Sequence, residues 1–580
     1  MDETASFNLI DEPWIRVRDG TGAVREASLL ELFSQAPRLK CLANDLPTQD
    51  FAILRVLLAI LQRAISPMLD DLDEDAEPAE VWGRLWEASE LPMDAIEAYL
   101  AKWHDRFDLF DPEHPFMQVP GLERANGEQV DKEDHEPFLR RLITDFPSRK
   151  NKRLFTNRVA ESAARLSYAE GARWLVHVQS FDVSGPKNYV VGEPERYEKG
   201  GKTYPGGISW CGKIGCLYLE GNTLKQTLLL NFDPRAVDDS DGFYSDDDAP
   251  VWELPPCNPS EGHESRRYPP QGRAELYTWQ TRWIRLSAED DYVTNAVIGS
   301  GDKIADADGD LYPLENMTIW SLTSGSNSSP RLTPMEHEVD KALWRGLSSV
   351  FNKENRTESQ ASYRPGIVQW LECLGDISSP TDLYSLHSVG LKYDEQQKSS
   401  CVNSFDDKLE LSPSLFTVTG ERLVRLACGC VDATEKAVGS LWWLGVNLYI
   451  SAGGTAQKNK NGRRIILPDF VNTASRQAYF ELDGLFRQWL VSLSPNCDVT
   501  ERRCEWHKQA RRVLQAIADE AIRSSGPKAI VGAMASHEKF EKVQREEWMN
   551  TSIAKMHFDK SLKHALPLEE DEKWEEEING

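Results

Sequence analysis

The last third of the chain is the part whose fold its sequence constrains most narrowly. From about residue 410 the apolar residues recur at helical spacing, as at Leu482, Phe486 and Trp489, and Gly or Pro pairs separate the runs. The pattern predicts four long helices, over 413–452, 472–494, 499–525 and 536–565. Amphipathic helices with short to moderate connections pack together, so we expect a C-terminal four-helix bundle over 406–568. An acidic tail, 569–580, is expected to fray.

The preceding residues mix helical and strand patterns. FNLIDEPWIRV (7–17) predicts a short strand followed by a hairpin at Asp19-Gly20. LPTQDFAILRVLLAILQRAI (46–65) is apolar over most of its surface, which predicts a core helix capped by Thr48 or Asp50. A second helical stretch is predicted over 80–106 and an amphipathic helix over 167–182.

Strand patterns dominate from about 270 to 325. LYTWQTRWIRL (276–286) and YVTNAVI (292–298) read as strands, and Asp308-Gly309 as a hairpin turn. The predicted fold class is therefore α+β, with a large mixed α/β N-terminal domain over 1–405 followed by the bundle.

Composition excludes several classes of function. The chain has 580 residues and a formal charge of −27, so bulk electrostatic attraction to nucleic acid is disfavoured and any contact must come from local basic patches. No apolar run reaches about 18 residues, so no membrane span is expected. The opening MDETASFN lacks the basic and apolar regions of a signal peptide, and ten scattered cysteines fit reduced thiols. We therefore expect a cytoplasmic protein.

Two segments break the acidic pattern. RRLITDFPSRKNKRLFTNR (140–158) carries seven Lys or Arg against one acid, Asp145, which is a local charge of +6. The connection QKNKNGRR (457–464) is a second cationic patch. Such segments are either solvated loops or phosphate contacts, in which Arg and Lys displace counterions. The candidate nucleic-acid or complex contacts are Arg149, Lys150, Asn151, Lys152, Arg153, Asn157, Arg158, Lys458, Lys460, Arg463 and Arg464.

The stretch 200–221, GGKTYPGGISWCGKIGCLYLEG, is unusually rich in glycine. Seven of its residues are glycine, whereas the whole chain has 37 in 580. Glycine lets another backbone or a ligand approach closely, so such a stretch either closes a hairpin or presses the main chain against a phosphate or a base edge. Composition alone favours the hairpin.

Catalytic and metal signatures are missing from the sequence. There is no Gly-x-Ser-x-Gly, no His-Glu-x-x-His and no Gly-x-x-x-x-Gly-Lys-Ser/Thr. Cys211 and Cys216, like Cys428 and Cys430, are not Cys-x-x-Cys pairs, and buried structural thiols are the preferred interpretation. We therefore expect no catalytic residue, no metal and no cofactor.

Six motifs occur in an order that identifies a family. They are FNLIDEPWIRV, LPTQDFAILRVLLAIL, RFDLFDPEHPFMQV, YAEGARWLVHVQSFD, the glycine-rich stretch ending LEGNTLKQTLLLNF, and LYTWQTRWIRL. Each is modest alone, but together they resemble the CasA family, the large subunit of the type I-E CRISPR surveillance complex, Cascade. The likeness runs to about residue 325 and weakens after it. Arg16 stands where the family usually has Pro, and the two zinc-binding Cys-x-x-Cys pairs of some members are absent.

The resemblance implies a non-catalytic subunit that recognises a protospacer-adjacent motif in double-stranded DNA from the minor groove. It also implies help in opening the duplex for guide-RNA pairing and recruitment of a helicase-nuclease. The partners would be the other Cascade subunits, CRISPR RNA, target DNA and that helicase-nuclease. The segment 149–158 falls where the family has a loop contacting the guide-RNA end. The implied DNA-binding residues are Gly206, Gly207, Ile208 and Ser209 in a glycine loop, Lys303 reaching the groove, and a glutamine wedge between a strand and a helix, Gln396 and Gln397.

Two other functions stay open. One is a purely structural scaffold of a ribonucleoprotein complex, in which the glycine loop only shapes the fold. The other is a nucleic-acid-processing enzyme with dispersed catalytic residues, which would cleave in a metal-dependent reaction.

Overall fold

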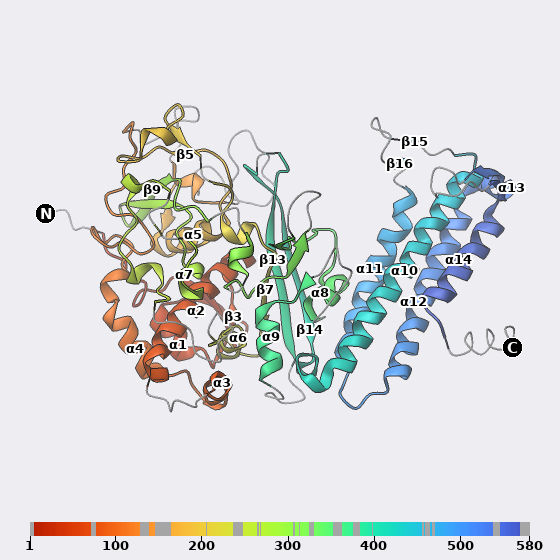
Figure 1. Cartoon of the computed structure of the whole chain (residues 1–580), viewed down its shortest axis with the longest axis horizontal. Helices are drawn as coiled ribbons and strands as arrows, with labels where there is room; N and C mark the ends of the chain where they lie inside the picture. Colours follow the sequence, from red (N-terminus) through yellow and green to blue (C-terminus); the bar gives the residue numbers. More distant parts are fainter. Residues whose placement is uncertain are drawn as a thin grey trace. The chain divides into compact units, whose positions relative to one another are not determined.

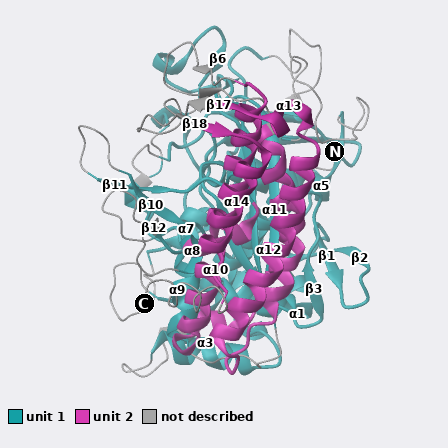
Figure 2. Cartoon of the chain, turned by 90° about the vertical axis from the view of Figure 1, so that its right-hand side faces the viewer, with its two compact units in different colours: residues 1–341, 349–409 teal, residues 342–348, 410–580 magenta. Residues whose placement is uncertain are grey.

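The computed structural model divides into two compact units. It describes residues 5–70, 77–127, 138–144, 164–204, 206–235, 247–263, 266, 268–304, 308–312, 314–323, 330–351, 362–374, 383–396, 398–454, 457–458, 465–466, 470–536 and 546–568. Unit 1 is Met1–Lys341 with Ser349–Leu409, and unit 2 is Ala342–Ser348 with Glu410–Gly580 (Figure 2). The boundary expected from the sequence lies at 405–406.

A three-stranded antiparallel sheet, ordered β2–β1–β3, opens unit 1. β1 (Ile15–Asp19) and β2 (Val24–Ala27) form the predicted hairpin, and β3 (Leu39–Leu42) pairs with the other edge of β1. The Asp19 carboxylate accepts hydrogen bonds from the Thr21 and Ala23 amides, at 2.8 and 3.1 Å. An aspartate that bonds backbone two residues ahead favours a turn, which is why the hairpin could be predicted.

Helix α2 (Pro47–Asp70) is the core helix of unit 1, as predicted. It begins at Pro47, not at Thr48 or Asp50, and proline suits a first turn because its missing N–H needs no acceptor. The Asp50 carboxylate instead accepts from the Asn44 amide, at 2.8 Å. Pro47–Met68 is long and apolar enough to cross a membrane by composition, contrary to expectation, but 78% of its apolar window is buried inside the protein. The apolar surface of α2 is therefore covered by protein.

The other helices before the bundle are α1 (Leu29–Gln35), α3 (Pro78–Glu87), α4 (Met93–Lys102), α5 (Tyr168–Phe181), α6 (Leu224–Leu230), α7 (Arg273–Tyr277), α8 (Leu347–Phe351) and α9 (Gly366–Cys373) (Figure 1). The remaining strands before the bundle form four small sheets. One contains β4 (Leu166–Ser167), β9 (Tyr292–Gly299) and β8 (Trp283–Glu289), and a second contains β7 (Cys216–Glu220), β13 (Tyr384–Tyr393) and β14 (Cys401–Leu411). A third contains β10 (Trp320–Thr323), β11 (Arg331–Pro334) and β12 (Ser362–Tyr363), and β5 (Lys187–Asn188) pairs with β6 (Lys202–Thr203) in the fourth.

Tertiary contacts override several local predictions. The predicted strand over 276–286 begins instead inside α7, because the Asp248 carboxylate accepts from the Ala274 and Glu275 amides, both at 3.0 Å. An N-terminal cap supplied by a distant residue leaves no local signal. Helix α5 was predicted as amphipathic, yet all its residues except Tyr168 and Glu170 are buried.

Two further predictions were wrong in their element boundaries. The helical stretch over 80–106 is broken into α3, α4 and a single 3-10 turn (His104–Arg106), and Pro92 precedes the start of α4. Asp308-Gly309 lies in a 3-10 helix (Asp308–Leu311) and does not close a hairpin, because β9 already pairs with β8 and β4.

Unit 2 contains the predicted long helices packed side by side (Figures 1 and 2). They are α10 (Glu421–Ser451), α11 (Phe470–Val491), α12 (Val499–Arg523) and α14 (Thr551–Ala565), with the short α13 (Gly526–Val531) and the strand pairs β15 (Gln457–Lys458) with β16 (Ile465–Ile466) and β17 (Ala533–Ser536) with β18 (Glu546–Met549). The α+β fold class is confirmed. The fourth helix was predicted too long, because β18 occupies 546–549.

Aromatic side chains hold the helices of unit 2 together. The Phe486 ring of α11 stacks on Trp344, with centroids 4.5 Å apart, and meets the edge of Trp506 of α12 at 5.0 Å. The Trp506 indole N–H donates to the Thr434 hydroxyl of α10, at 2.9 Å. Rings that also satisfy their polar atom give directional as well as apolar packing.

A buried ion pair lies at the centre of unit 1. The guanidinium of Arg55, on α2, donates to both carboxylate oxygens of Glu315, at 3.1 and 2.8 Å, and both side chains are at most 1% exposed. The same carboxylate accepts from the Trp210 indole at 2.7 Å and from the Met317 amide at 3.1 Å. The Tyr277 ring covers the guanidinium at 4.2 Å.

Arg55→Met should strongly destabilise the protein, because it leaves the Glu315 carboxylate buried without its cation. Losing one partner of a buried pair costs about 3–5 kcal/mol. We expect a large fall in the urea midpoint measured by circular dichroism. Arg16→Met is the matched control, since Arg16 pairs with Asp45 at 2.5 Å with both side chains partly exposed, and should cost under about 1 kcal/mol. Equal effects of the two variants would contradict the prediction.

His177 should make stability depend on pH. Its ring is fully buried in α5, 2.9 Å from the Thr48 hydroxyl and 3.2 Å from that of Thr144, and burial lowers its pKa from 6.5 to about 3. Between these values the unfolded chain binds more protons, so the stability that neutral His177 contributes is lost as the pH falls from 6.5 towards 3. His177→Asn removes this titration. As the pH falls through this range, the difference in unfolding free energy between wild type and variant should narrow by up to about 1.4 kcal/mol per pH unit. A difference that does not change with pH would contradict the prediction.

Candidate nucleic-acid interface

The glycine loop, Gly206–Ser209, lies between β6 and the 3-10 helix Trp210–Gly212 of unit 1. Gly206 is exposed and Gly207 half-buried, whereas Ile208 and Ser209 are 5% and 0% exposed. Gly207 has φ of +133°, a region that side-chain-bearing residues rarely adopt. Only the two glycines therefore present backbone to solvent.

Ser209 anchors the end of the loop. Its hydroxyl lies 3.1 Å from the Val178 carbonyl, to which it donates, and 2.8 Å from the Thr281 hydroxyl. Its amide donates to the Asp182 carbonyl at 3.0 Å. The side chains of Ile208 and Ser209, both predicted as DNA contacts, thus face the core in this structure.

Lys303 lies against the glycine loop, although about a hundred residues separate them in the chain. A Cβ added to Gly206 would lie 2.8 Å from Lys303 Cε and 2.9 Å from its Cγ, so the lysine side chain runs directly over this glycine. The Lys303 amide donates to the His263 carbonyl at 3.0 Å, which fixes the start of that side chain. The structure therefore brings together two residues that the sequence predicted as one site.

Lys213 is a neighbour of the loop that the sequence analysis missed. Its ammonium nitrogen would lie 3.9 Å from a Cβ on Gly207, so cationic side chains border both glycines. Its position within the glycine-rich stretch was the available signal. Both lysines have other partners in the protein.

Arg282, which the sequence analysis also did not predict, hydrogen-bonds the glycine loop from the protein interior. Its Nη2 donates to the carbonyls of Gly207 and Val183, at 2.9 and 3.1 Å, and its Nε contacts the Asp182 carboxylate at 2.5 Å. Lys187 Nζ lies 2.5 Å from the same carboxylate. Burial would raise the pKa of Asp182, but these two cations lower it below its ordinary value. Nothing local to Arg282 signals this role, because Gly207 lies 75 residues away.

Gln396 lies in the turn between β13 and β14, where it is exposed; Gln397 lies outside the described residues. The turn joins two strands, so the expected place between a strand and a helix was wrong. The Asp394 carboxylate closes the turn by accepting from the Ser399 and Ser400 amides, at 2.6 and 3.1 Å. The Ser184 amide donates to the Lys398 carbonyl at 2.8 Å, and Val183, its neighbour, is held by Arg282. This short path links the hairpin to the glycine loop.

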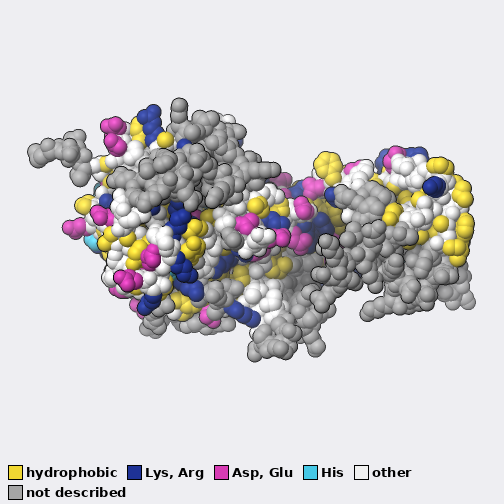
Figure 3. Space-filling model, turned by 90° about the horizontal axis from the view of Figure 1, so that it is seen from above, with side chains coloured by type: hydrophobic (Ala, Val, Ile, Leu, Met, Phe, Trp, Pro, Cys, Tyr) yellow, Lys and Arg dark blue, Asp and Glu magenta, His cyan; other side chains and the backbone are white. Residues whose placement is uncertain are grey.

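Most residues of the two basic segments lie outside the part of the chain that the structure describes. Arg149, Lys150, Asn151, Lys152, Arg153, Asn157 and Arg158, with Lys460, Arg463 and Arg464, lie outside the described residues, and Lys458 falls in β15. Figure 3 shows Lys and Arg side chains gathered in a broken band over one face of unit 1, among apolar and acidic ones. Local basic surface thus exists within an acidic chain.

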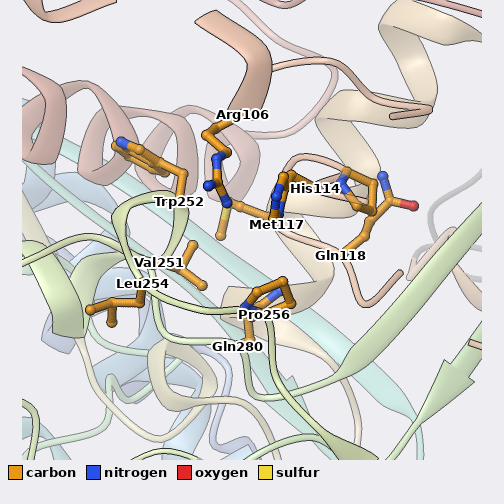
Figure 4. Close-up of a pocket in the computed structure, with 10 residues that line it drawn as sticks. Arg106, His114, Met117, Gln118, Val251, Trp252, Leu254, Pro256 and Gln280 are labelled. Carbon is orange, nitrogen blue, oxygen red and sulfur yellow. The ribbon is translucent and has the colours of Figure 1, made fainter. Parts of the chain in front are cut away.

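Gln280, two residues before Arg282, contributes to the lining of a pocket. Figure 4 shows its lining, which is Arg106, His114, Pro115, Met117, Gln118, Val251, Trp252, Leu254, Pro256 and Gln280. The lining includes no serine, cysteine or carboxylate that could pair with His114 as a nucleophile. Among the described residues no cluster of three or more His, Cys, Asp or Glu could hold a metal ion.

Comparisons with known proteins identify the family of this chain. The family model described as CRISPR-associated protein Cse1 matches residues 8–517. A CRISPR-associated protein CasA/Cse1 from Thermus thermophilus is 32% identical over 361 residues, which is 61% of this chain. The chain spans 62% of the length of that relative in the match.

Solved structures extend the likeness to nearly the whole chain. Thermobifida fusca Cse1 is 33% identical with a TM-score of 0.80, over 97% of this chain and 98% of its own. Cse1 from Acidimicrobium ferrooxidans is 26% identical with a TM-score of 0.75, over the same shares. A chain of a CRISPR RNA-guided surveillance complex, 17% identical, has the same fold, with a TM-score of 0.58 over 90% and 99%. The family match and the whole-length likeness to two Cse1 structures establish that this chain belongs to the Cse1 (CasA) family, the large subunit of type I-E Cascade.

Proposed function

We propose that this Cse1 chain recognises the protospacer-adjacent motif in double-stranded DNA within an RNA-guided surveillance complex. The loop Gly206–Gly207 and Lys303 would meet the minor groove, and the β13–β14 turn at Gln396 would enter the duplex beside it. Once the duplex opens, guide RNA pairs with one strand and a helicase-nuclease is recruited. The chain itself carries out no chemistry in this role.

One observation carries the proposal: the Lys303 side chain lies across Gly206. Bare backbone beside a long cation suits a groove about 6 Å wide, where bulky side chains are excluded and acceptors line the floor. The ammonium group can reach an acceptor or a neighbouring phosphate. A loop that only closed a hairpin would not require a lysine from elsewhere in the chain.

The net charge of the chain favours DNA recognition through specific local contacts over binding by general electrostatic attraction. At −27 the chain as a whole repels DNA, so affinity must come from local cations and from the other subunits of the complex. The basic segment 149–158, with its seven arginines, lysines and asparagines, would contact the guide-RNA end of the complex. A purely structural scaffold predicts no dependence on the motif.

Gly206→Ala should reduce motif-dependent binding by the assembled complex by about ten-fold or more, because the new methyl group displaces the Lys303 side chain. Lys303→Ala should act in the same direction. The measurement is the affinity for duplexes that match the guide and carry or lack the motif.

Gly83→Ala is the matched control, since nothing lies within 4 Å of a Cβ there and its φ is ordinary. It should leave binding unchanged. If Gly206→Ala and Lys303→Ala leave the preference for the motif intact in a folded complex, the loop is structural and the scaffold alternative stands.

The isolated chain should bind duplex DNA weakly and lose that binding as salt rises, since only local cations offset its charge. A titration of labelled duplex at increasing sodium chloride measures this. Tight binding that persists at high salt would contradict it.

A further inference from the structure

We propose that the pocket lined by Arg106, His114 and Gln280 is a binding site for a carboxylate group. The site shares no residue with those that the proposed function assigns to DNA. Half of its lining comes from one segment, RFDLFDPEHPFMQV (106–119), which is one of the six motifs that identify the family and has no part in the proposed function.

The packing of that segment accounts for its aromatic residues and leaves its basic ones unexplained. Phe107 and Phe116 stack on each other with ring centroids 5.1 Å apart, and both contact the ring of Trp252, at 5.1 and 5.8 Å. Aromatic rings that pack in this way stabilise the fold by apolar contact. The side chains of Arg106 and His114 take no part in this cluster, so their place at the pocket needs another reason.

Arg106 brings a positive charge to the pocket. It ends the 3-10 helix His104–Arg106, and its side chain is 25% exposed. Its Nε lies 3.5 Å from the carboxylate of the neighbouring Asp105, which is itself mostly exposed. Within the part of the chain that the structure describes, its Nη1 and Nη2 donate to no acceptor. This end of a guanidinium binds a carboxylate through two parallel hydrogen bonds.

Two glutamines line the pocket, and the protein satisfies the side-chain amide of only one. Gln118 donates from Nε2 to the Leu109 carbonyl and accepts at Oε1 from the Leu286 amide, both at 2.8 Å. Gln280, which is 2% exposed, accepts at Oε1 from the Cys257 thiol at 3.1 Å, whereas its Nε2 is buried without a hydrogen-bond partner. A buried donor without an acceptor is costly, so a ligand that supplies an acceptor would be stabilised here.

His114 is a second polar group that the protein leaves unsatisfied. Its Nδ1 is buried and has no hydrogen-bond partner among the described residues. Figure 4 shows the His114 and Arg106 side chains next to each other, with Gln280 across the pocket beyond Pro256. Polar groups from distant parts of the chain thus surround one space.

The size and charge of the pocket select the ligand. The cavity is about 30 Å³, which is room for about two water-sized groups and so for the two oxygens of a carboxylate. None of the described lining residues is acidic, whereas Arg106 is a cation, so an anion is favoured. Phosphate and sulfate would have to shed more water, and the apolar walls formed by Val251, Leu254 and Pro256 cannot replace it. A carboxylate on an apolar stem matches both the donors and the walls.

Acetate is the probe, and saturation transfer to its methyl protons reports binding by NMR. The full-length chain is titrated with sodium acetate at constant ionic strength. We expect a dissociation constant on the order of 1 mM, a range open to a ligand of about four non-hydrogen atoms. Sulfate at the same ionic strength should not displace the acetate. Absence of saturation transfer would mean that the pocket holds water only, and equal displacement by sulfate would mean a general anion effect; either result overturns the assignment.

Arg106→Gln tests the pocket directly, because it removes the charge and should weaken acetate binding by about ten-fold or more. Arg502→Gln is the matched control: Arg502 is 34% exposed, pairs with Glu505 at 2.7 Å and belongs to unit 2. It removes one positive charge elsewhere and should leave acetate binding unchanged. Circular dichroism checks that each variant folds.

Unchanged acetate affinity in a folded Arg106→Gln variant, or an equal loss in Arg502→Gln, would refute the site. Gln280→Met removes the buried donor at similar length and should also weaken binding. If Arg106→Gln does not fold, Gln280→Met gives the same test, and unchanged affinity in that variant refutes the site as well.

The assembled complex identifies the source of the carboxylate. If the natural ligand is a free organic acid, acetate should bind the complex as it binds the isolated chain. If a carboxylate of another subunit fills the pocket, acetate should give no saturation transfer with the complex, and Arg106→Gln should weaken incorporation of the chain by about ten-fold.

Discussion

The buried pair of Arg55 and Glu315 is the interaction on which unit 1 depends. It joins the core helix α2 to the segment after residue 314, and through the indole of Trp210 it reaches the glycine-rich stretch. Trp210 follows Ser209 directly, so the end of the glycine loop is tied to this buried ion pair. A buried carboxylate needs hydrogen bonds to be tolerated, and this one accepts from three groups. The guanidinium bonds it through Nη1 alone, while Nε and Nη2 are buried without a hydrogen-bond partner and the Tyr277 ring covers the cation. A movement of Trp210 away from its place would break its hydrogen bond to the buried carboxylate.

Glycines in the same stretch serve different physical purposes. A Cβ on Gly212 would lie 2.5 Å from the Tyr393 hydroxyl, and one on Gly215 would lie 2.5 Å from the Met335 carbonyl, so these two allow close packing. Gly207 instead needs its positive φ, and Gly206 makes room for Lys303. Counting glycines could not separate these roles, because each depends on atoms contributed by distant parts of the chain.

The sequence predicted what depends on local pattern. The hairpin at Asp19, the core helix α2 and the helices of unit 2 follow from turn chemistry and apolar spacing, and the structure contains them. Elements fixed by distant partners were misjudged: Asp248 caps α7 from more than 25 residues away, and both faces of α5 are covered. In the site, the resemblance to a family placed Lys303 beside Gly206, which composition alone could not do. The role of Arg282 was not predicted, because Gly207 and Asp182, which it hydrogen-bonds, lie 75 and 100 residues away in the chain.

If the proposed function holds, this acidic protein must gain its specificity for DNA from geometry. Mobile surface cations bind any phosphate, and with a net charge of −27 they cannot provide strong attraction in this chain. Rigidity is what the two buried ion networks supply, Arg55 with Glu315 beneath Trp210, and Arg282 with Asp182 beneath Gly207. The buried charges therefore fix the position of the loop that the proposed function assigns to DNA.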